Sequence, residues 1–98
     1  MKVFLTKRAK GNFQSIFDYL IAEWGKRVAL AFEQRIQDFF DLLESFPEIG
    51  SLEYNSSTKQ IRGFQLTKQV RAFYRIKNDR IIILAFFDVR QNPNQKRF

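Results

Sequence analysis

The sequence predicts a two-layer α+β fold in which a helical hairpin packs on one face of a small antiparallel sheet. Two long stretches in the first half of the chain carry apolar residues at helical spacing. Several shorter stretches in the second half carry alternating or continuous apolar residues. The element order is therefore β-α-α-β-β-β, which is typical of an α+β sandwich. With 98 residues, the chain is expected to form a single domain over residues 1–98.

The first helix is expected to follow a short strand over residues 1–6. Thr6 can cap this helix because its hydroxyl can accept a backbone N–H from the first turn. The apolar positions then form one continuous stripe: Ala9, Phe13, Ile16, Phe17, Leu20, Ile21 and Trp24. Gly25 is placed to end the helix, since a residue without Cβ can adopt a positive φ.

The second helix is expected to run from about Arg27 to Phe46. Its apolar stripe contains Val28, Phe32, Ile36, Phe39, Leu43 and Phe46, and Pro47 ends it. Because only Gly25 and a residue or so separate the two helices, they must fold back on each other as an antiparallel hairpin. Leu30, Phe40 and Leu42 lie off the main stripe, so this helix has apolar surface on a second side.

The second half of the chain is expected to contain a connection and three strands. Residues 47–59 are rich in Pro, Gly, Asn and Ser and read as a polar connection. Strands are expected over 61–66, 70–77 and 80–87, with a short reversal at residues 67–69. Asn78 and Asp79 suit a two-residue hairpin turn because both tolerate positive φ.

Composition excludes several classes of chemistry. The chain has no cysteine and no histidine, which excludes disulfides, thiolate zinc sites and an imidazole base. Phosphate-binding loops, dinucleotide-binding glycine patterns, metal-ligand clusters and paired carboxylate motifs are also absent, so we expect no cofactor and no metal. The longest apolar run, residues 81–87, is too short to cross a bilayer, and no signal-peptide core is present. We therefore expect a cytoplasmic protein without a membrane partner.

The net charge of +7 is distributed unevenly. Residues 1–10 carry four basic and no acidic groups, residues 11–58 carry three basic and eight acidic, and residues 59–98 carry ten basic and two acidic. Such asymmetry indicates a polyanion or an acidic protein as the ligand of one face. The alternative is that the charge only keeps the protein soluble.

The strand over residues 70–77 provides the candidate functional face. Strict alternation should send Arg71, Phe73 and Arg75 away from the helices, where cations can contact phosphates and a ring can stack on a base. Neighbouring strands, turns and the tail could extend this basic face, which then comprises Arg62, Lys68, Arg71, Phe73, Arg75, Arg90, Lys96 and Arg97. In the alternative reading, these cations only prevent sheet aggregation, or one arginine pairs internally with Asp88.

The ordered combination of segments resembles the RelE/ParE toxins of type II toxin–antitoxin systems. The first half contributes Ile16-Phe17-Asp18-Tyr19, Trp24, Ala31-Phe32, Ile36, Leu43, Phe46-Pro47 and Gly50. The second half contributes Ile61-Arg62-Gly63-Phe64, the run from Val70 to Ile76, the run from Ile81 to Leu84, and Asp88-Val89-Arg90-Gln91-Asn92-Pro93. The resemblance covers nearly the whole chain and agrees with the element order derived above.

The resemblance implies a cytoplasmic toxin, of the kind that stabilises plasmids, neutralised by a cognate antitoxin that buries apolar grooves. Leu30, Phe40 and Leu42 are the residues we expect the antitoxin to contact. ParE-like members poison DNA gyrase and are not nucleases. RelE-like members cleave messenger RNA on the ribosome, using Lys and Arg together with a C-terminal Tyr or His. A degenerate member that harms neither target is a further alternative.

The residues that match the family favour the gyrase branch. Arg71 and Arg90 match arginines of both branches, and Lys68 lies near a basic residue of the RelE catalytic set. If the protein were a nuclease, its catalytic residues would be Lys68, Arg71, Arg90 and Lys96. The tail instead ends in Lys96, Arg97 and Phe98, and phenylalanine cannot exchange a proton. The segment 91–93 also resembles the ParE branch, so we expect a toxin that binds gyrase.

Overall fold

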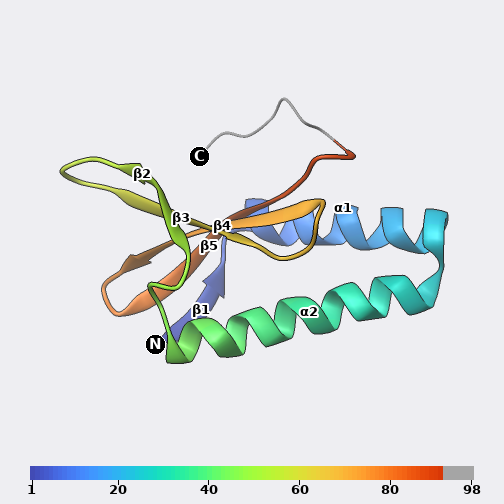
Figure 1. Ribbon diagram of the computed structural model, residues 1–98, viewed down its shortest axis with the longest axis horizontal. Helices are drawn as coiled ribbons and strands as arrows, with labels where there is room; N and C mark the ends of the chain where they lie inside the picture. The colour runs from blue at the N-terminus through green and yellow to red at the C-terminus, as the bar shows by residue number, and fades with distance from the viewer. Residues whose placement is uncertain (92–98) are drawn as a thin grey trace.

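The computed structural model describes residues 1–91 and has the predicted α+β architecture (Figure 1). Along the chain, the elements are β1 (Lys2–Leu5), α1 (Lys7–Trp24), α2 (Lys26–Ser45), β2 (Ser51–Asn55), β3 (Gln60–Gln65), β4 (Val70–Lys77) and β5 (Arg80–Asp88). The five strands form one sheet in the order β1-β5-β4-β3-β2. β1, the helical hairpin and strands β3, β4 and β5 confirm the predicted elements in their predicted order, and β2 is an additional strand.

The sheet differs from the prediction in two respects. β1 pairs with β5 in parallel, so the sheet is mixed rather than antiparallel. β2 lies inside the stretch 47–59 that was expected to be only a connection. Both differences have the same cause: apolar periodicity reports which residues are buried, whereas strand direction and edge pairing leave no such pattern.

No hydrophobic pattern in the sequence predicts β2, because it is an edge strand with all five residues exposed. It pairs antiparallel with β3, and the register shifts between Leu52 and Tyr54. This shift leaves Glu53 without a residue opposite, which is the geometry of a β-bulge. Bulges twist an edge strand away from straight pairing, so this edge is protected against addition of another strand.

Both helices end where the sequence predicts, within one residue. The Thr6 hydroxyl accepts the N–H of Ala9 at 3.0 Å, which caps α1. Gly25 separates α1 from α2 and has a φ of +91°, a backbone conformation that favours glycine. In Figure 1, the end of the hairpin where α1 and α2 meet projects beyond the sheet. Neither helix is long and apolar enough to cross a membrane within residues 1–91.

The core lies between the hairpin and one face of the sheet. The helices contribute Ala9, Ile16, Leu20, Ala29, Phe32, Ile36, Phe39 and Leu43, and the sheet and its turns contribute Leu66, Val70, Ala72, Tyr74, Ile81, Ile83 and Phe86. Phe39 stacks on Phe64 with ring centroids 4.8 Å apart, which joins α2 to β3. Apart from Val28 and Phe46, both exposed, the apolar stripe predicted for α2 is the stripe that is buried.

The β4–β5 hairpin has the predicted two-residue turn. Asn78 and Asp79 both have positive φ, at 51° and 60°. Further along the hairpin, the partner of Phe73 is Ala85, whereas the partner of Tyr74 is Ile83, so Leu84 is an extra residue in β5. The Leu84 carbonyl accepts the hydroxyl of Thr6 at 3.0 Å, which ties the start of α1 to the bulge.

Candidate functional site

The face of β4 away from the helices is less open than the sequence predicts. Tyr74 and Ile76 face the helical core as expected, and Arg71, Phe73 and Arg75 alternate to the other side. Phe73, however, is 0% exposed. Its neighbours across the strands are Gly63 and Ala85. The expectation that Phe73 stacks on a base is therefore wrong, because the ring is fully buried, and the Arg71 guanidinium lies 5.9 Å from its centre.

Arg71 forms an ion pair and hydrogen bonds at the surface of the sheet, where 26% of its side chain remains exposed. Its guanidinium forms an ion pair with Glu53 of β2 and donates to the Ser51 hydroxyl at 3.1 Å and to Gln65 Oε1 at 3.0 Å. A Cβ on Gly63 would lie 2.6 Å from Glu53 Oε1 and 2.9 Å from Arg71 Nε, so any other residue at position 63 would displace this ion pair. The Arg71 charge is thus matched by a carboxylate.

Arg62 and Arg75 lie on opposite faces of the sheet. In the sheet, Arg62 of β3 lies opposite Tyr74 of β4, which places the Arg62 side chain on the helical face. It donates there to the carbonyls of Gly50 at 2.9 Å and Glu48 at 3.3 Å. The expectation that Arg62 extends the basic face is therefore wrong. Arg75 is half-buried, and its Nε has no hydrogen-bond partner among the residues that the structure describes.

Lys68 and Arg90 lie together in a cleft between the hairpin and the β3–β4 turn. The cleft has a volume of about 480 Å³. Apolar residues form its helical wall, and polar residues come from the turn and from the end of β5: Leu20, Val28, Ala31, Phe32, Arg35, Thr67, Lys68, Gln69 and Arg90. We call this surface the basic cleft. Its lining contains three cations and no carboxylate, so it is suited to an anionic group with an apolar portion.

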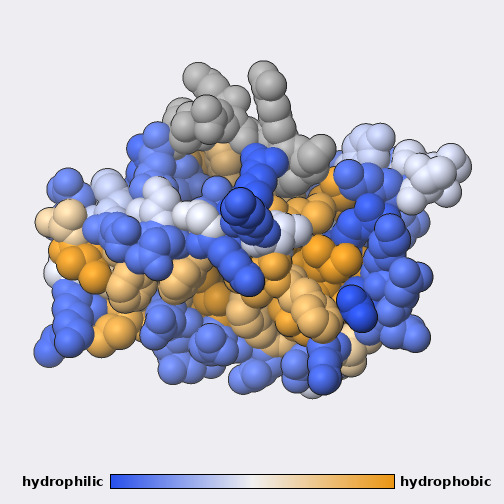
Figure 2. All heavy atoms as spheres, turned by 180° about the vertical axis from the view of Figure 1, so that it is seen from behind, coloured by the Kyte–Doolittle hydropathy of each residue, from blue (hydrophilic) through white to orange (hydrophobic). Residues whose placement is uncertain are grey.

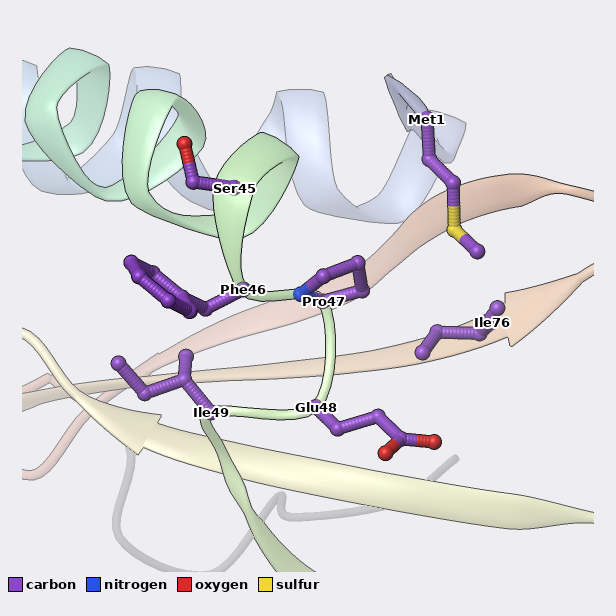
Figure 3. Close-up of a pocket in the computed structure, with 7 residues that line it drawn as sticks. All are labelled: Met1, Ser45, Phe46, Pro47, Glu48, Ile49 and Ile76. Carbon is purple, nitrogen blue, oxygen red and sulfur yellow. The ribbon is translucent and has the colours of Figure 1, made fainter.

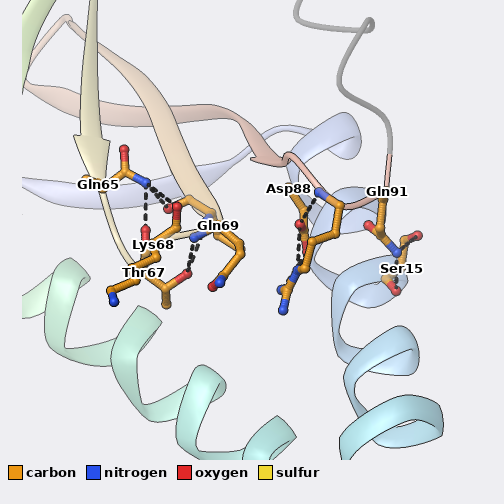
Figure 4. Close-up of polar contacts among 9 residues, drawn as sticks. Ser15, Gln65, Thr67, Lys68, Gln69, Asp88 and Gln91 are labelled. Carbon is orange, nitrogen blue, oxygen red and sulfur yellow. Dashed lines mark hydrogen bonds and ion pairs between the residues drawn. The ribbon is translucent and has the colours of Figure 1, made fainter.

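A buried carboxylate fixes Arg90 in the basic cleft (Figure 4). The Asp88 side chain is 0% exposed and accepts from Arg90 through Nη2 at 2.8 Å, Nε at 3.0 Å and the backbone N–H at 2.9 Å. These hydrogen bonds to Asp88 raise the pKa of Arg90 above its ordinary value. The guanidinium also lies 5.3 Å from the centre of the Tyr19 ring. Arg90 is therefore a rigid cation whose charge is partly compensated.

The turn that carries Lys68 is fixed by its own side chains (Figure 4). The Thr67 hydroxyl accepts the N–H groups of Gln69 at 3.2 Å and Val70 at 3.1 Å. The Gln65 amide donates to the Thr67 carbonyl at 2.6 Å. The Lys68 side chain remains exposed at the mouth of the basic cleft.

Arg35 is a cleft residue that the sequence analysis did not identify. Its Nε donates to the Leu66 carbonyl at 2.7 Å, which ties α2 to the β3–β4 turn. In sequence, Arg35 stands three residues after Phe32 and beside Ile36 of the buried stripe. Its position at the edge of the buried apolar stripe was the one feature of the sequence that could have identified Arg35. Many solvent-facing arginines occupy such positions, so this feature is not specific.

The three residues expected to contact an antitoxin do not share one face of α2. Residues 30, 40 and 42 point in different directions when each residue turns the helix by about 100°. Leu30 is exposed, whereas Phe40 and Leu42 are half-buried. Leu42 lines a shallow groove between α2 and β3 with Arg35, Phe39 and Phe64. Because Arg35 also lines the basic cleft, the groove and the basic cleft adjoin along α2.

The remaining predicted residues, Lys96 and Arg97, lie outside the described residues. Within residues 1–91, the tyrosines are Tyr19 beneath Arg90, Tyr54 on the exposed edge strand, and Tyr74 in the core. The Tyr74 hydroxyl donates to the Pro47 carbonyl at 2.8 Å and accepts the N–H of Gly50 at 2.8 Å. Tyr74 is therefore a structural anchor of the α2–β2 loop.

Comparisons with solved structures agree with the fold. A chromosomal ParDE toxin–antitoxin structure from Pseudomonas aeruginosa is 24% identical, with a TM-score of 0.72 over 90% of this chain and 95% of that chain. A YoeB/ParE toxin from Agrobacterium tumefaciens is 14% identical, with a TM-score of 0.59 over 90% and 98% of the two chains. A copper-bound mutant toxin from Helicobacter pylori is 19% identical, with a TM-score of 0.53 over 90% and 93%.

Comparison with protein-family models identifies the family of this chain. No curated protein matches the sequence significantly. The family model described as the ParE toxin of the type II toxin–antitoxin system parDE matches residues 3–93. This match spans both helices, all five strands and the basic cleft. The chain therefore belongs to the ParE toxin family of type II toxin–antitoxin systems.

Proposed function

We propose that this ParE-family protein inhibits DNA gyrase by binding it through the basic cleft, and that a cognate antitoxin neutralises it. Lys68, Arg35 and Arg90 provide the charge for this contact, and Val28 and Phe32 provide the apolar wall. A cleft of this kind suits recognition of a protein surface that combines acidic and apolar residues.

The proposal rests on Arg71 and Arg90, the two arginines that match arginines of both the RelE and the ParE branch, because each of them is held by a carboxylate. Arg71 is paired with Glu53, and Arg90 is paired with buried Asp88. A nuclease needs cations free to stabilise the charge that develops on phosphate in the transition state. It also needs a group that exchanges a proton near neutral pH, and the sequence contains no histidine. Both features favour a toxin that acts by binding.

Ribosome-dependent cleavage of messenger RNA is the second candidate, because Lys68 lies beside Arg35 and Arg90 in a cleft lined by no carboxylate. In this reading, Lys68 would be the base, and its neighbouring cations would stabilise the negative charge that develops on phosphate.

Two assays on the same purified protein separate the candidates. We expect inhibition of gyrase supercoiling and no cleavage of messenger RNA on translating ribosomes. Lys68→Ala should weaken the inhibition several-fold, whereas Lys10→Ala, an exposed lysine on α1, should leave it unchanged. Cleavage of ribosome-bound messenger RNA with unaffected supercoiling would refute the gyrase proposal.

The antitoxin is tested genetically. We expect a neighbouring reading frame that encodes a short acidic protein, and growth arrest on expression of the toxin that this neighbour relieves. If expression causes no arrest and neither purified activity is present, the protein is a degenerate member of the family.

A further inference from the structure

The basic cleft is assembled from segments far apart in the chain. Its lining comes from α1, α2, the β3–β4 turn and the end of β5. Another large hollow, of about 530 Å³ beyond the end of α2, is built differently, because the consecutive residues 45–49 form most of its lining (Figure 3). In the basic cleft, local sequence does not fix the position of Lys68 relative to Arg35 and Arg90, so contacts between the segments must fix it.

Apolar packing alone does not determine where Lys68 lies. The contact between the hairpin and the sheet is mainly apolar. Seen from behind, the molecule shows a band of apolar side chains between polar margins (Figure 2). Apolar contacts are non-directional, and the Lys68 side chain is exposed. The hydrogen bonds of the β3–β4 turn are directional and therefore decide the position of Lys68.

The backbone of the turn is tied on both sides of Lys68. The Val70 carbonyl accepts the N–H of Thr67 at 3.2 Å. The Gln69 carbonyl accepts the N–H of Val89 at 3.0 Å, which joins the turn to the end of β5. These bonds involve the residues before and after Lys68, so support for the peptide groups between them has to come from side chains.

Gln65 supports these peptide groups from β3 (Figure 4). Its side-chain amide donates to the Thr67 carbonyl at 2.6 Å and to the Lys68 carbonyl at 3.5 Å. The amide oxygen of Gln65 accepts from Arg71 Nη1 at 3.0 Å. Because a guanidinium donates hydrogen bonds and cannot accept them, Arg71 fixes which end of the Gln65 amide faces the turn. Arg71, whose charge is matched by Glu53, thus also acts on the turn through Gln65.

Arg35 supports the turn from α2. Its Nε donates to the Leu66 carbonyl at 2.7 Å, and the Leu66 side chain is buried in the core. A hydrogen bond from a charged donor is stronger than the neutral bonds within the turn. This bond sets the separation between α2 and the turn, and thus the width of the basic cleft. Gln65 and Arg35 therefore hold the turn from two different elements.

We propose that Gln65 and Arg35 are positioning residues that hold Lys68 at the mouth of the basic cleft. This inference rests on the proposed function, in which the cleft binds gyrase. A lysine held in place before binding loses less conformational entropy when the target arrives. Gln65 is uncharged and lies outside the lining of the cleft, so it acts on the target through the turn. Arg35 both contributes charge to the cleft and holds the turn.

Amide hydrogen exchange tests the positioning without any target. Gln65→Met and Arg35→Met should each make the Gln69 amide, whose acceptor lies within the turn, exchange about two- to tenfold faster, as expected for the loss of one hydrogen bond. The matched controls are exposed residues of the same two elements that lie outside the cleft lining, Gln60→Met and Arg27→Met. Both controls should leave exchange of the Gln69 amide unchanged.

Inhibition of gyrase supercoiling tests the consequence for activity. Gln65→Met changes no charge, yet it should raise the toxin concentration for half-maximal inhibition by about two- to tenfold. Gln60→Met should not change it. In a protein that already carries Lys68→Ala, Gln65→Met should have no further effect, because Gln65 acts through Lys68. Equal effects of Gln65→Met with and without Lys68 would overturn the proposal.

The two assays separate failure of this proposal from failure of the proposed function. If the wild type does not inhibit gyrase, the proposed function fails, whereas faster exchange in Gln65→Met and Arg35→Met supports their hold on the turn. Unchanged exchange in both variants overturns the positioning role whether or not gyrase is inhibited. A uniform increase at every amide, including those of the core strands, would show general destabilisation and would also overturn it.

Discussion

At the scale of single residues, carboxylate partners decide what the cations of this toxin can do. Alternation correctly predicts which side of β4 carries Arg71 and Arg75, but not that Arg71 faces Glu53 or that Phe73 is buried. Glu53 belongs to a strand without any burial pattern, so the sequence offers no signal for this ion pair. The sequence analysis did raise an internal arginine pair with Asp88, and Arg90 forms it.

Asp88→Asn should destabilise the protein by about 1–3 kcal/mol, because it removes a fully buried carboxylate that accepts three hydrogen bonds from Arg90. Urea unfolding measures this change. Glu33→Gln is the control, since Glu33 is exposed on α2 and its replacement should change stability by no more than about 0.5 kcal/mol. Equal stability of the two variants would show that the Asp88–Arg90 pair contributes nothing.

Tyr74→Phe should cost about 1–3 kcal/mol, because it removes the hydroxyl that joins Pro47 and Gly50. Burial raises the pKa of Tyr74 above its ordinary value of 10.0. As the pH rises, the unfolded chain ionises at this tyrosine first, so its contribution to stability is present below about pH 10 and is lost above it. The stability difference between the wild type and Tyr74→Phe should therefore narrow above about pH 10.

The check on this prediction is unfolding at several pH values. Tyr54→Phe serves as the control because Tyr54 is 53% exposed on the edge strand. A wild-type protein whose stability relative to Tyr74→Phe does not change with pH would contradict the assignment.

At the scale of elements, the helices, β1 and the inner strands were predictable, whereas the edge strand β2 and the parallel pairing of β1 with β5 were not. Periodicity located α1, α2, β4 and β5 to within about one residue, because each of them buries a regular set of side chains. The sequence did not predict the basic cleft, for a different reason. It forms where the overhanging hairpin meets a turn about 30 residues further along the chain, and no local pattern reports that meeting.

The loop between α1 and α2 provides a matched pair of glycine substitutions. Gly25→Ala should destabilise the hairpin by about 1 kcal/mol or more, because the φ of +91° disfavours any residue with a Cβ. Gly11→Ala lies inside α1, where no atom is within 4 Å of the added Cβ, and should stabilise the protein by about 0.5–1 kcal/mol. Thermal unfolding of both variants measures the two effects, and shifts of the same sign would contradict this account.

At the scale of the whole molecule, charge is separated along the long axis of α2. From residue 36 to residue 58 the chain carries five acidic groups and no basic one, whereas the basic cleft collects three cations at the other end. Net charge alone could not reveal this polarity. The separation of charge becomes apparent only in the folded structure, where the acidic segment and the basic cleft lie toward opposite ends of α2.

Position, rather than net charge, should therefore control activity. Lys68→Glu and Lys10→Glu change the net charge equally, but only Lys68 lines the basic cleft. We expect Lys68→Glu to raise the toxin concentration for half-maximal gyrase inhibition by about tenfold or more, and Lys10→Glu to change it little. The difference should shrink at high salt, where charges are screened. Equal effects of both variants would indicate nonspecific attraction.

The parallel pairing of β1 with β5 has a consequence for synthesis in the cell. Lys2 lies opposite Arg80, so the first strand has no partner in the sheet until the last strand has been translated. A nascent chain stalled before that point has a helical hairpin but neither β5 nor Arg90, and thus no complete basic cleft. The basic cleft can therefore form only after β5 and Arg90 have been translated, well after both helices of the hairpin.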